Sequence, residues 1–86
     1  MVKSVMNTTP SYEEIVDFIA AGTTPESVVA FRPTPAAVQR VEDLVARSRD
    51  GVISSDEQAE LDDYFQLEHL LILAKAKARQ KLSIAS

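Results

Sequence analysis

The sequence predicts an all-α protein, with two short N-terminal helices followed by an αα-hairpin whose C-terminal helix is long. Apolar residues recur at helical spacing, and no segment alternates as a half-buried strand does. Proline, glycine and Ser/Thr residues stand where helices should begin and end. The 86 residues, of which 45% are apolar, suffice for one core. We therefore expect a flexible N-terminus over residues 1–10 and a single helical domain over residues 11–86.

The first two helices are predicted from local signals. Ser11 and Glu14 have the spacing of a capping box, and Gly22 is a residue that tolerates the left-handed conformation after a helix end. The first helix should therefore run to Ala21. Thr24 followed by Pro25 predicts the start of a second helix, which must be short because Pro33 disfavours helical backbone at the preceding residue.

The hairpin follows from the same kind of signal. Thr34 and Pro35 should open a third helix that ends at Gly51, and its apolar stripe is predicted to be Val38, Val41, Leu44 and Val45. Ser54 and Glu57 form a second capping box, from which the last helix should run from Ser55 to about Leu82. That helix would be about 42 Å long against about 22 Å for its neighbour, so it should overhang.

The middle of the last helix is apolar on every side, which requires burial on every side. Its large apolar residues are Tyr64, Phe65, Leu67, Leu70, Leu71, Ile72 and Leu73. Either the two N-terminal helices enclose this segment in a monomer, or a second copy or a partner protein covers the remainder. We expect a partner contact to be carried by Tyr64, Phe65, Glu68, His69, Leu71 and Ile72.

The charge is unevenly distributed. Residues 1–74 contain all thirteen acidic residues against five basic ones, whereas the only basic cluster is Lys75, Lys77, Arg79 and Lys81 near the C-terminus. An acidic body favours a basic protein partner. The basic cluster is a weak candidate for nucleic-acid binding, because a helix C-terminus attracts cations in any case and no aromatic residue is interleaved for base stacking.

Two weak metal patterns are outweighed by structural explanations. Residues 46–57 resemble a calcium-binding EF-hand loop, but its first position is Ala46 and Arg47 and Arg49 add positive charge. His69 shares a helical face with Asp62 and Gln66, which is short of a di-iron pattern. We predict no metal site and no cofactor.

The residues expected of an enzyme are also missing. The chain has no cysteine, one histidine and no glycine-rich phosphate loop, so we predict no catalytic residues and no enzyme activity. Without cysteine, apolar spans of membrane length or a signal sequence, a cytoplasmic location is expected.

Two stretches carry a resemblance to a known group. Residues 11–35, SYEEIVDFIAAGTTPESVVAFRPTP, and residues 53–82, ISSDEQAELDDYFQLEHLLILAKAKARQKL, resemble small helical bacterial proteins, mainly of cyanobacteria. These are encoded ahead of a gene for an HNH-type nuclease. The resemblance implies an antitoxin or immunity-type protein that neutralises a partner nuclease by binding it. The alternatives are a helical adaptor or homo-oligomerisation module, and a DNA-binding regulator using the basic helix end.

Overall fold

The computed structural model describes residues 9–85, so the predicted flexible N-terminus lies outside the described residues except for Thr9 and Pro10. Four helices make up the described part: α1 (Glu13–Ala20), α2 (Pro25–Ala30), α3 (Pro35–Arg49) and α4 (Ser55–Ala85). No strand occurs within residues 9–85. The predicted all-α class is confirmed, with two short helices ahead of a hairpin.

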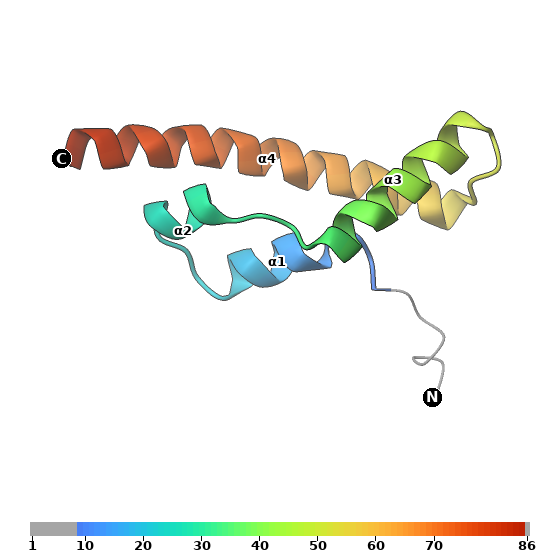
Figure 1. The fold of residues 1–86 in the computed structure, drawn as a ribbon, viewed down its shortest axis with the longest axis horizontal. Coiled ribbons are helices and arrows are strands. Elements are labelled where there is room, and N and C mark those ends of the chain that lie inside the picture. The colour runs from blue at the N-terminus through green and yellow to red at the C-terminus, as the bar shows by residue number, and fades with distance from the viewer. Residues whose placement is uncertain (1–8, 86) are drawn as a thin grey trace.

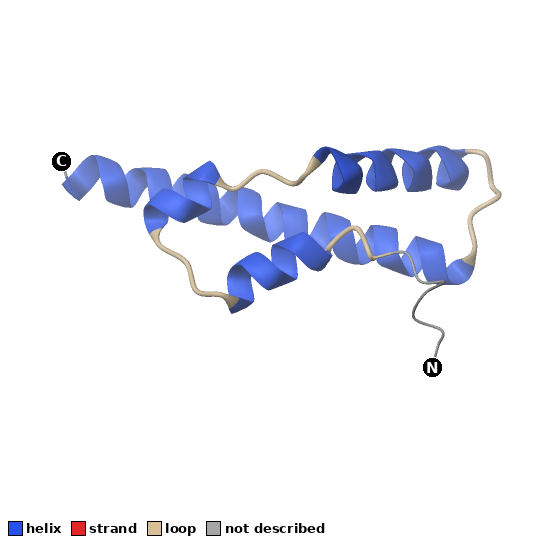
Figure 2. Ribbon diagram, turned by 60° about the horizontal axis from the view of Figure 1, so that its bottom comes forward, coloured by secondary structure: helices blue, strands red, loops and turns tan. Residues whose placement is uncertain are grey.

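Helix α4 is the axis of the molecule. Its 31 residues span about 46 Å, close to the longest dimension of the chain, 49 Å. Helices α1 and α2 lie below α4 in Figure 1, and α3 runs beside its first half. In the turned view of Figure 2, α3 and α1 flank α4 on opposite sides. In Figure 1, α3 crosses the first turns of α4, whereas the upper edge of the middle and C-terminal part of α4 is overlain by no other helix.

Most of the predicted helix ends are confirmed. Thr24 caps α2, accepting a hydrogen bond from the Ser27 amide, and Thr34 caps α3 in the same way from Ala37. Ser54 and Glu57 form the predicted capping box, with both hydrogen bonds at 3.1 Å. Gly22 and Gly51 have φ of 92° and 75°, which places both in the left-handed region that glycine tolerates best.

The capping box predicted at Ser11 does not form. Helix α1 has Tyr12 at its N-cap position and no side-chain cap. The Glu14 carboxylate instead accepts hydrogen bonds from the amide and hydroxyl of Thr34, and the Ser11 amide donates to Glu60 at 2.7 Å. Both groups are therefore used to join the N-terminal helices to the hairpin, a tertiary role that local spacing does not reveal.

The core lies along the inner side of α4. One cluster of buried residues joins α1, α2 and α4 through Ile15, Val28, Tyr64, Leu71 and Ala78. Leu44 of α3 is fully buried, and Ala37 and Leu61 are buried with it on the hairpin. Val38, predicted to face the core, is 39% exposed, because α3 is turned so that Ala37, one residue earlier, points inward.

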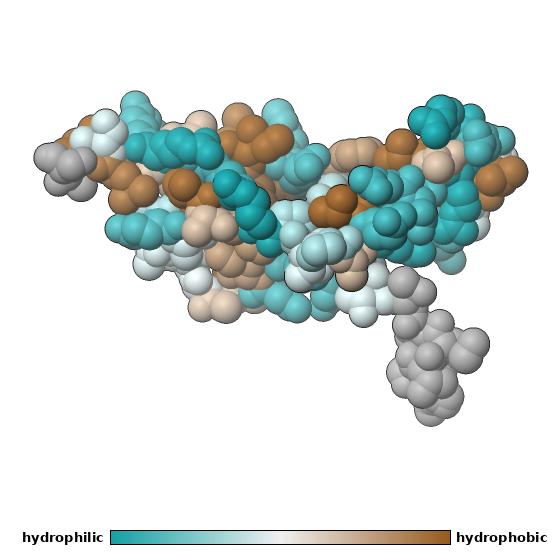
Figure 3. Space-filling view, viewed as in Figure 1, coloured by the Kyte–Doolittle hydropathy of each residue, from teal (hydrophilic) through white to brown (hydrophobic). Residues whose placement is uncertain are grey.

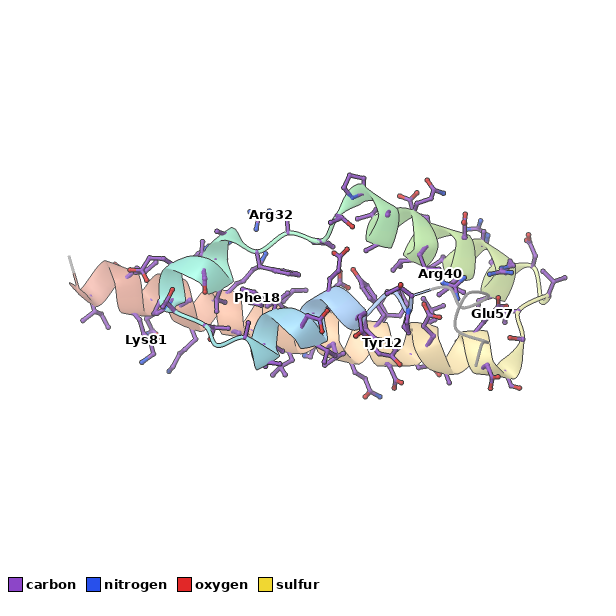
Figure 4. The ribbon with its side chains drawn as sticks, turned by 90° about the horizontal axis from the view of Figure 1, so that it is seen from below. Tyr12, Phe18, Arg32, Arg40, Glu57 and Lys81 are labelled. Carbon is purple, nitrogen blue, oxygen red and sulfur yellow. The ribbon has the colours of Figure 1, made fainter. Side chains whose placement is uncertain are left out.

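A partly buried ion pair joins the two helices of the hairpin, and its carboxylate also accepts a hydrogen bond from the N-terminal segment. Arg40 donates from Nη2 and Nε to the two Glu60 carboxylate oxygens at 2.8 and 3.1 Å. Burial of Glu60 opposes its charge, but the Arg40 side chain and the Ser11 amide outweigh this effect, so the pKa of Glu60 is lowered from its ordinary value. In Figure 4, Arg40 points toward the first turns of α4, where Glu57 also lies.

Candidate protein-docking surface

The side of α4 that faces away from the other helices is rich in large apolar side chains. Phe65, Leu70, Ile72 and Leu73 are 45%, 54%, 56% and 55% exposed. We call these four residues, with His69 and Ala76 between and beside them, the outer face. Figure 3 shows apolar side chains gathered at the upper edge of the molecule, over the middle of α4. The sequence left two alternatives open, and the single chain does not enclose this apolar segment on every side.

The outer face consists of two neighbouring rows at helical spacing. Positions three and four residues apart share a face, so Phe65, His69, Ile72 and Ala76 form one row. Leu70 and Leu73 lie on the second row, between Gln66 and Lys77. The six residues of the outer face are exposed, and so are Gln66 and Lys77, which extend its second row at either end. Two parallel rows make a surface wide enough to receive the side chains of another helix, as in ridges-into-grooves packing.

The six predicted contact residues divide between the two sides of the helix. Phe65, His69 and Ile72 are exposed on the outer face. Tyr64 and Leu71 are 5% and 8% exposed and belong to the core of this chain, and Glu68 is half-buried beside Tyr64. Burial, with the nearby charges of Glu68 and Glu14, raises the pKa of Tyr64. The surface that is available to a partner thus includes three of the six.

Leu70 and Leu73 are docking candidates that the predicted set omits. The structure places them on the outer face, because the buried residues Leu61, Tyr64, Leu71 and Ala78 recur at spacings of three and seven and mark the inward side. Leu73 and Leu70 fall on the opposite and adjoining positions of the helix. The sequence alone gives no such signal, since this segment is apolar on every side.

An apolar groove continues the outer face on one side. It is lined by Ile72, Leu71 and Lys75 of α4 together with Phe31 and Pro33 of the segment after α2. Phe31 packs against Phe18 of α1, with ring centroids 4.6 Å apart. Figure 4, which is seen from below, shows Phe18 in front of α4 and Arg32 on the neighbouring linker. The half-buried Phe31 and Pro33 therefore continue the apolar surface of Ile72 from α4 onto the segment after α2.

The predicted basic cluster does not form one continuous strip. Lys75 donates from Nζ to the Phe31 carbonyl at 2.7 Å, so its charge is held within the fold. Its pKa is lowered, first by burial and then by the positive charges of Arg32 and Arg79. Lys77 and Lys81 are exposed beside α2, with Lys81 near the end of α4 in Figure 4, and Arg79 is exposed on another side.

The loop with the EF-hand resemblance adopts a helix-ending conformation. The Val52 amide donates to Arg47 and the Gly51 amide to Ser48, the pair of hydrogen bonds of a Schellman motif. Glu57 pairs with Arg47 at 2.8 Å and caps α4, so it faces its own chain. Within residues 9–85, no three His, Cys, Asp or Glu side chains are grouped to hold a metal ion.

None of the helices in the described part is long and apolar enough to cross a membrane. Charged residues of opposite sign flank the outer face. The exposed Asp62 and Asp63 lie at its N-terminal end, and the exposed Lys77 lies at its C-terminal end. The outer face thus presents apolar ridges flanked by charges of opposite sign, an arrangement that can bind a surface of complementary shape and charge. Comparisons with protein-family models, curated proteins and solved structures find no match for this chain.

Proposed function

We propose that this chain is a protein-binding helical module that works through the outer face of α4, and that it is an antitoxin or immunity-type protein that neutralises a partner nuclease. The observation that carries the proposal is the half-exposed set Phe65, Leu70, Ile72 and Leu73 on one side of a single helix. Single exposed apolar residues are ordinary, but a contiguous apolar surface is typical of an interaction site.

The shape of the surface supports helix-mediated recognition. Apolar anchors at spacings of three, four and seven are what an amphipathic partner or a hydrophobic groove recognises. Phe65 is a candidate for the largest single contribution, because aromatic residues dominate the energetics of many interfaces. The ring of Phe65 already packs edge-on against the ring of Tyr64, with ring centroids 5.9 Å apart. This packing limits the conformational entropy that the Phe65 side chain loses on binding.

The charge of the body favours a basic partner. Residues 1–74 carry thirteen acidic against five basic residues. Two of these bases, Arg40 and Arg47, are already paired with Glu60 and Glu57. Nucleases that grip phosphate backbones present cationic surfaces, and complementary charge accelerates the encounter of two proteins.

The choice of a nuclease as partner also draws on the resemblance of residues 11–35 and 53–82 to proteins encoded beside HNH-type nucleases. The exposed Phe65, His69, Leu70 and Ile72 all lie in the second stretch. A protein that covers the nucleic-acid-binding surface of such an enzyme would block its activity without chemistry of its own.

The test is co-expression and purification with the product of the neighbouring gene, which the proposal predicts to be a nuclease. We compare the unaltered chain with a double variant, Leu70→Glu and Leu73→Glu, which places two charges on the outer face. Val52→Glu is the matched control, because Val52 is 68% exposed but lies in the α3–α4 turn. Circular dichroism verifies that each variant retains its helices.

The unaltered chain and Val52→Glu should co-purify with the nuclease and suppress DNA cleavage, whereas the double variant should lose at least about 100-fold in affinity, because buried unpaired charges are costly at an interface. The proposal is wrong if the nuclease neither co-purifies with the unaltered chain nor is inhibited by it. It is also wrong if the double variant binds as well as the control.

A further inference from the structure

We propose that, when no partner protein is bound, the outer face of α4 is covered by a second copy of the same chain, with the two α4 helices antiparallel and crossing near Leu70. This inference rests on the proposed function only in that both use the outer face, from which the partner protein would displace the second copy.

The charges on either side of Leu70 favour this arrangement. Asp63 and Lys77 lie seven residues before and after Leu70, two turns away in each direction on the same row of the helix. Antiparallel pairing about Leu70 therefore places Asp63 of each copy opposite Lys77 of the other. A parallel pairing in register would instead oppose like charges at both positions, which is unfavourable.

Both charged groups are available for such a pairing. Asp63 and Lys77 are exposed, and neither has an ion-pair partner within residues 9–85. Asp62 and Lys81 extend the same polarity toward the two ends of α4. The helix is acidic in its first half and basic in its last turns, so only a reversed copy matches opposite charges along its length.

The sizes of the side chains fit the same centre. Phe65 and Ala76 belong to one row of the outer face, and the midpoint between them lies between residues 70 and 71. An antiparallel copy thus places the largest side chain of the row opposite the smallest, twice. A parallel copy places Phe65 against Phe65 and Ala76 against Ala76, which leaves a gap at the second position and loses packing contacts.

The rest of the fold leaves space for the second copy. Helices α1 and α2 lie below α4 in Figure 1, and α3 crosses only its first turns, so the upper edge of the middle of α4 is open. Two copies can therefore bring their outer faces together with their other helices pointing outward. In each copy, the dimer would bury four further apolar side chains, namely those of Phe65, Leu70, Ile72 and Leu73.

Sedimentation equilibrium of the full chain tests the charge pairing. The unaltered chain should be dimeric, Lys77→Glu should weaken the dimer by roughly tenfold, and adding Asp63→Lys to that variant should restore it, because the exchanged charges pair again. Glu26→Lys, an exposed charge reversal on α2, is the control and should leave the dimer unchanged. The inference is overturned if the unaltered chain stays monomeric at every concentration up to about 1 mM. It is also overturned if the second substitution does not restore the dimer.

Disulfide cross-linking tests the direction of the helices, since the natural chain has no cysteine. Asp62 and Gln80 are 18 residues, or five full turns, apart, so they occupy the same angular position on α4, and they lie eight and ten residues on either side of Leu70. A mixture of Asp62→Cys and Gln80→Cys chains should form the mixed disulfide and little of either homodimer. Efficient cross-linking of each variant to itself would show a parallel dimer and contradict the proposal. The proposal is also contradicted if the mixed disulfide forms no faster than the disulfide between two copies of the control variant Ala36→Cys, whose thiol lies on α3.

The two proposals can fail separately. If the chain is monomeric but Leu70→Glu with Leu73→Glu still abolishes nuclease binding, the second copy is excluded and the proposed function stands. If the dimer forms and the charge exchange restores it but the nuclease does not bind, the proposed function fails and the dimer stands.

Discussion

Leu70 and Leu71 are adjacent leucines in one helix whose replacement by alanine should have opposite consequences. Leu71 is 8% exposed and belongs to the core, whereas Leu70 is 54% exposed on the outer face. Because the residue type, the helix and the substitution are the same, the pair isolates the effect of burial. Leu71→Ala should destabilise the fold with its docking residues intact, and Leu70→Ala should weaken docking with the fold intact.

The expected magnitudes differ severalfold. Replacing a buried leucine by alanine costs about 2–5 kcal/mol. We expect about 3 kcal/mol for Leu71, because it packs against the two short helices α1 and α2, which can partly close the cavity. A chain of this size has a total stability of roughly 4–12 kcal/mol. The melting temperature should therefore fall by about 12–24 °C. Leu70→Ala should cost less than about 1 kcal/mol, since half its surface is already in water and alanine favours helix.

Thermal and urea unfolding, followed by circular dichroism, measure both variants. The measurement is made at low concentration, where self-association is weak, and repeated at high concentration, where a loss specific to Leu70→Ala should appear through the dimer. Equal destabilisation by the two substitutions at low concentration would refute the assignment of an inner and an outer side to α4.

Three further substitutions test the polar and backbone parts of the fold. The pKa of Glu60 is lowered below its ordinary 4.5, so the stabilising contribution of its carboxylate is present above that pH and is lost as the pH falls. The Glu60→Gln variant should therefore be less stable than the unaltered chain at neutral pH. In urea titrations at decreasing pH, it should lose less stability than the unaltered chain. Gly51→Ala should cost about 1 kcal/mol, because its φ of 75° is a conformation that alanine rarely adopts. No atom lies within 4 Å of the added Cβ, so the cost comes from the backbone alone, and an unchanged urea midpoint would contradict this. Thr24→Ala should cost about 1 kcal/mol through loss of the α2 cap, with the exposed Thr23→Ala as a near-neutral control.

The helix boundaries were predictable because their causes are local. Thr24, Thr34, Ser54 and Gly51 act within four residues of their own position, so the sequence contains both partners of each contact. Ser11 failed as a cap for the converse reason. Its amide is bound by Glu60, 49 residues away, and that contact depends on how the hairpin packs.

The orientation of the helices was less predictable. Periodicity identifies an inward side when the opposite side is polar, as in α1 with Ile15 inside and Asp17 outside. Residues 64–74 of α4 are apolar on all sides, so the pattern indicated an uncovered surface without showing which leucines formed it. The choice of Tyr64 and Leu71 as contacts, in place of Leu70 and Leu73, reflects this ambiguity.

The most direct test of the outer face as a docking surface is its protection by the partner nuclease. Ala76→Cys on the outer face and Ala36→Cys on α3 are equal changes at exposed positions, and each provides the single thiol of its chain. The rate of thiol labelling is measured at low chain concentration, with and without an excess of the nuclease. We predict labelling at least about tenfold slower at position 76 and unchanged at position 36 when the nuclease is present. Equal labelling rates at position 76 with and without a bound nuclease would contradict the account.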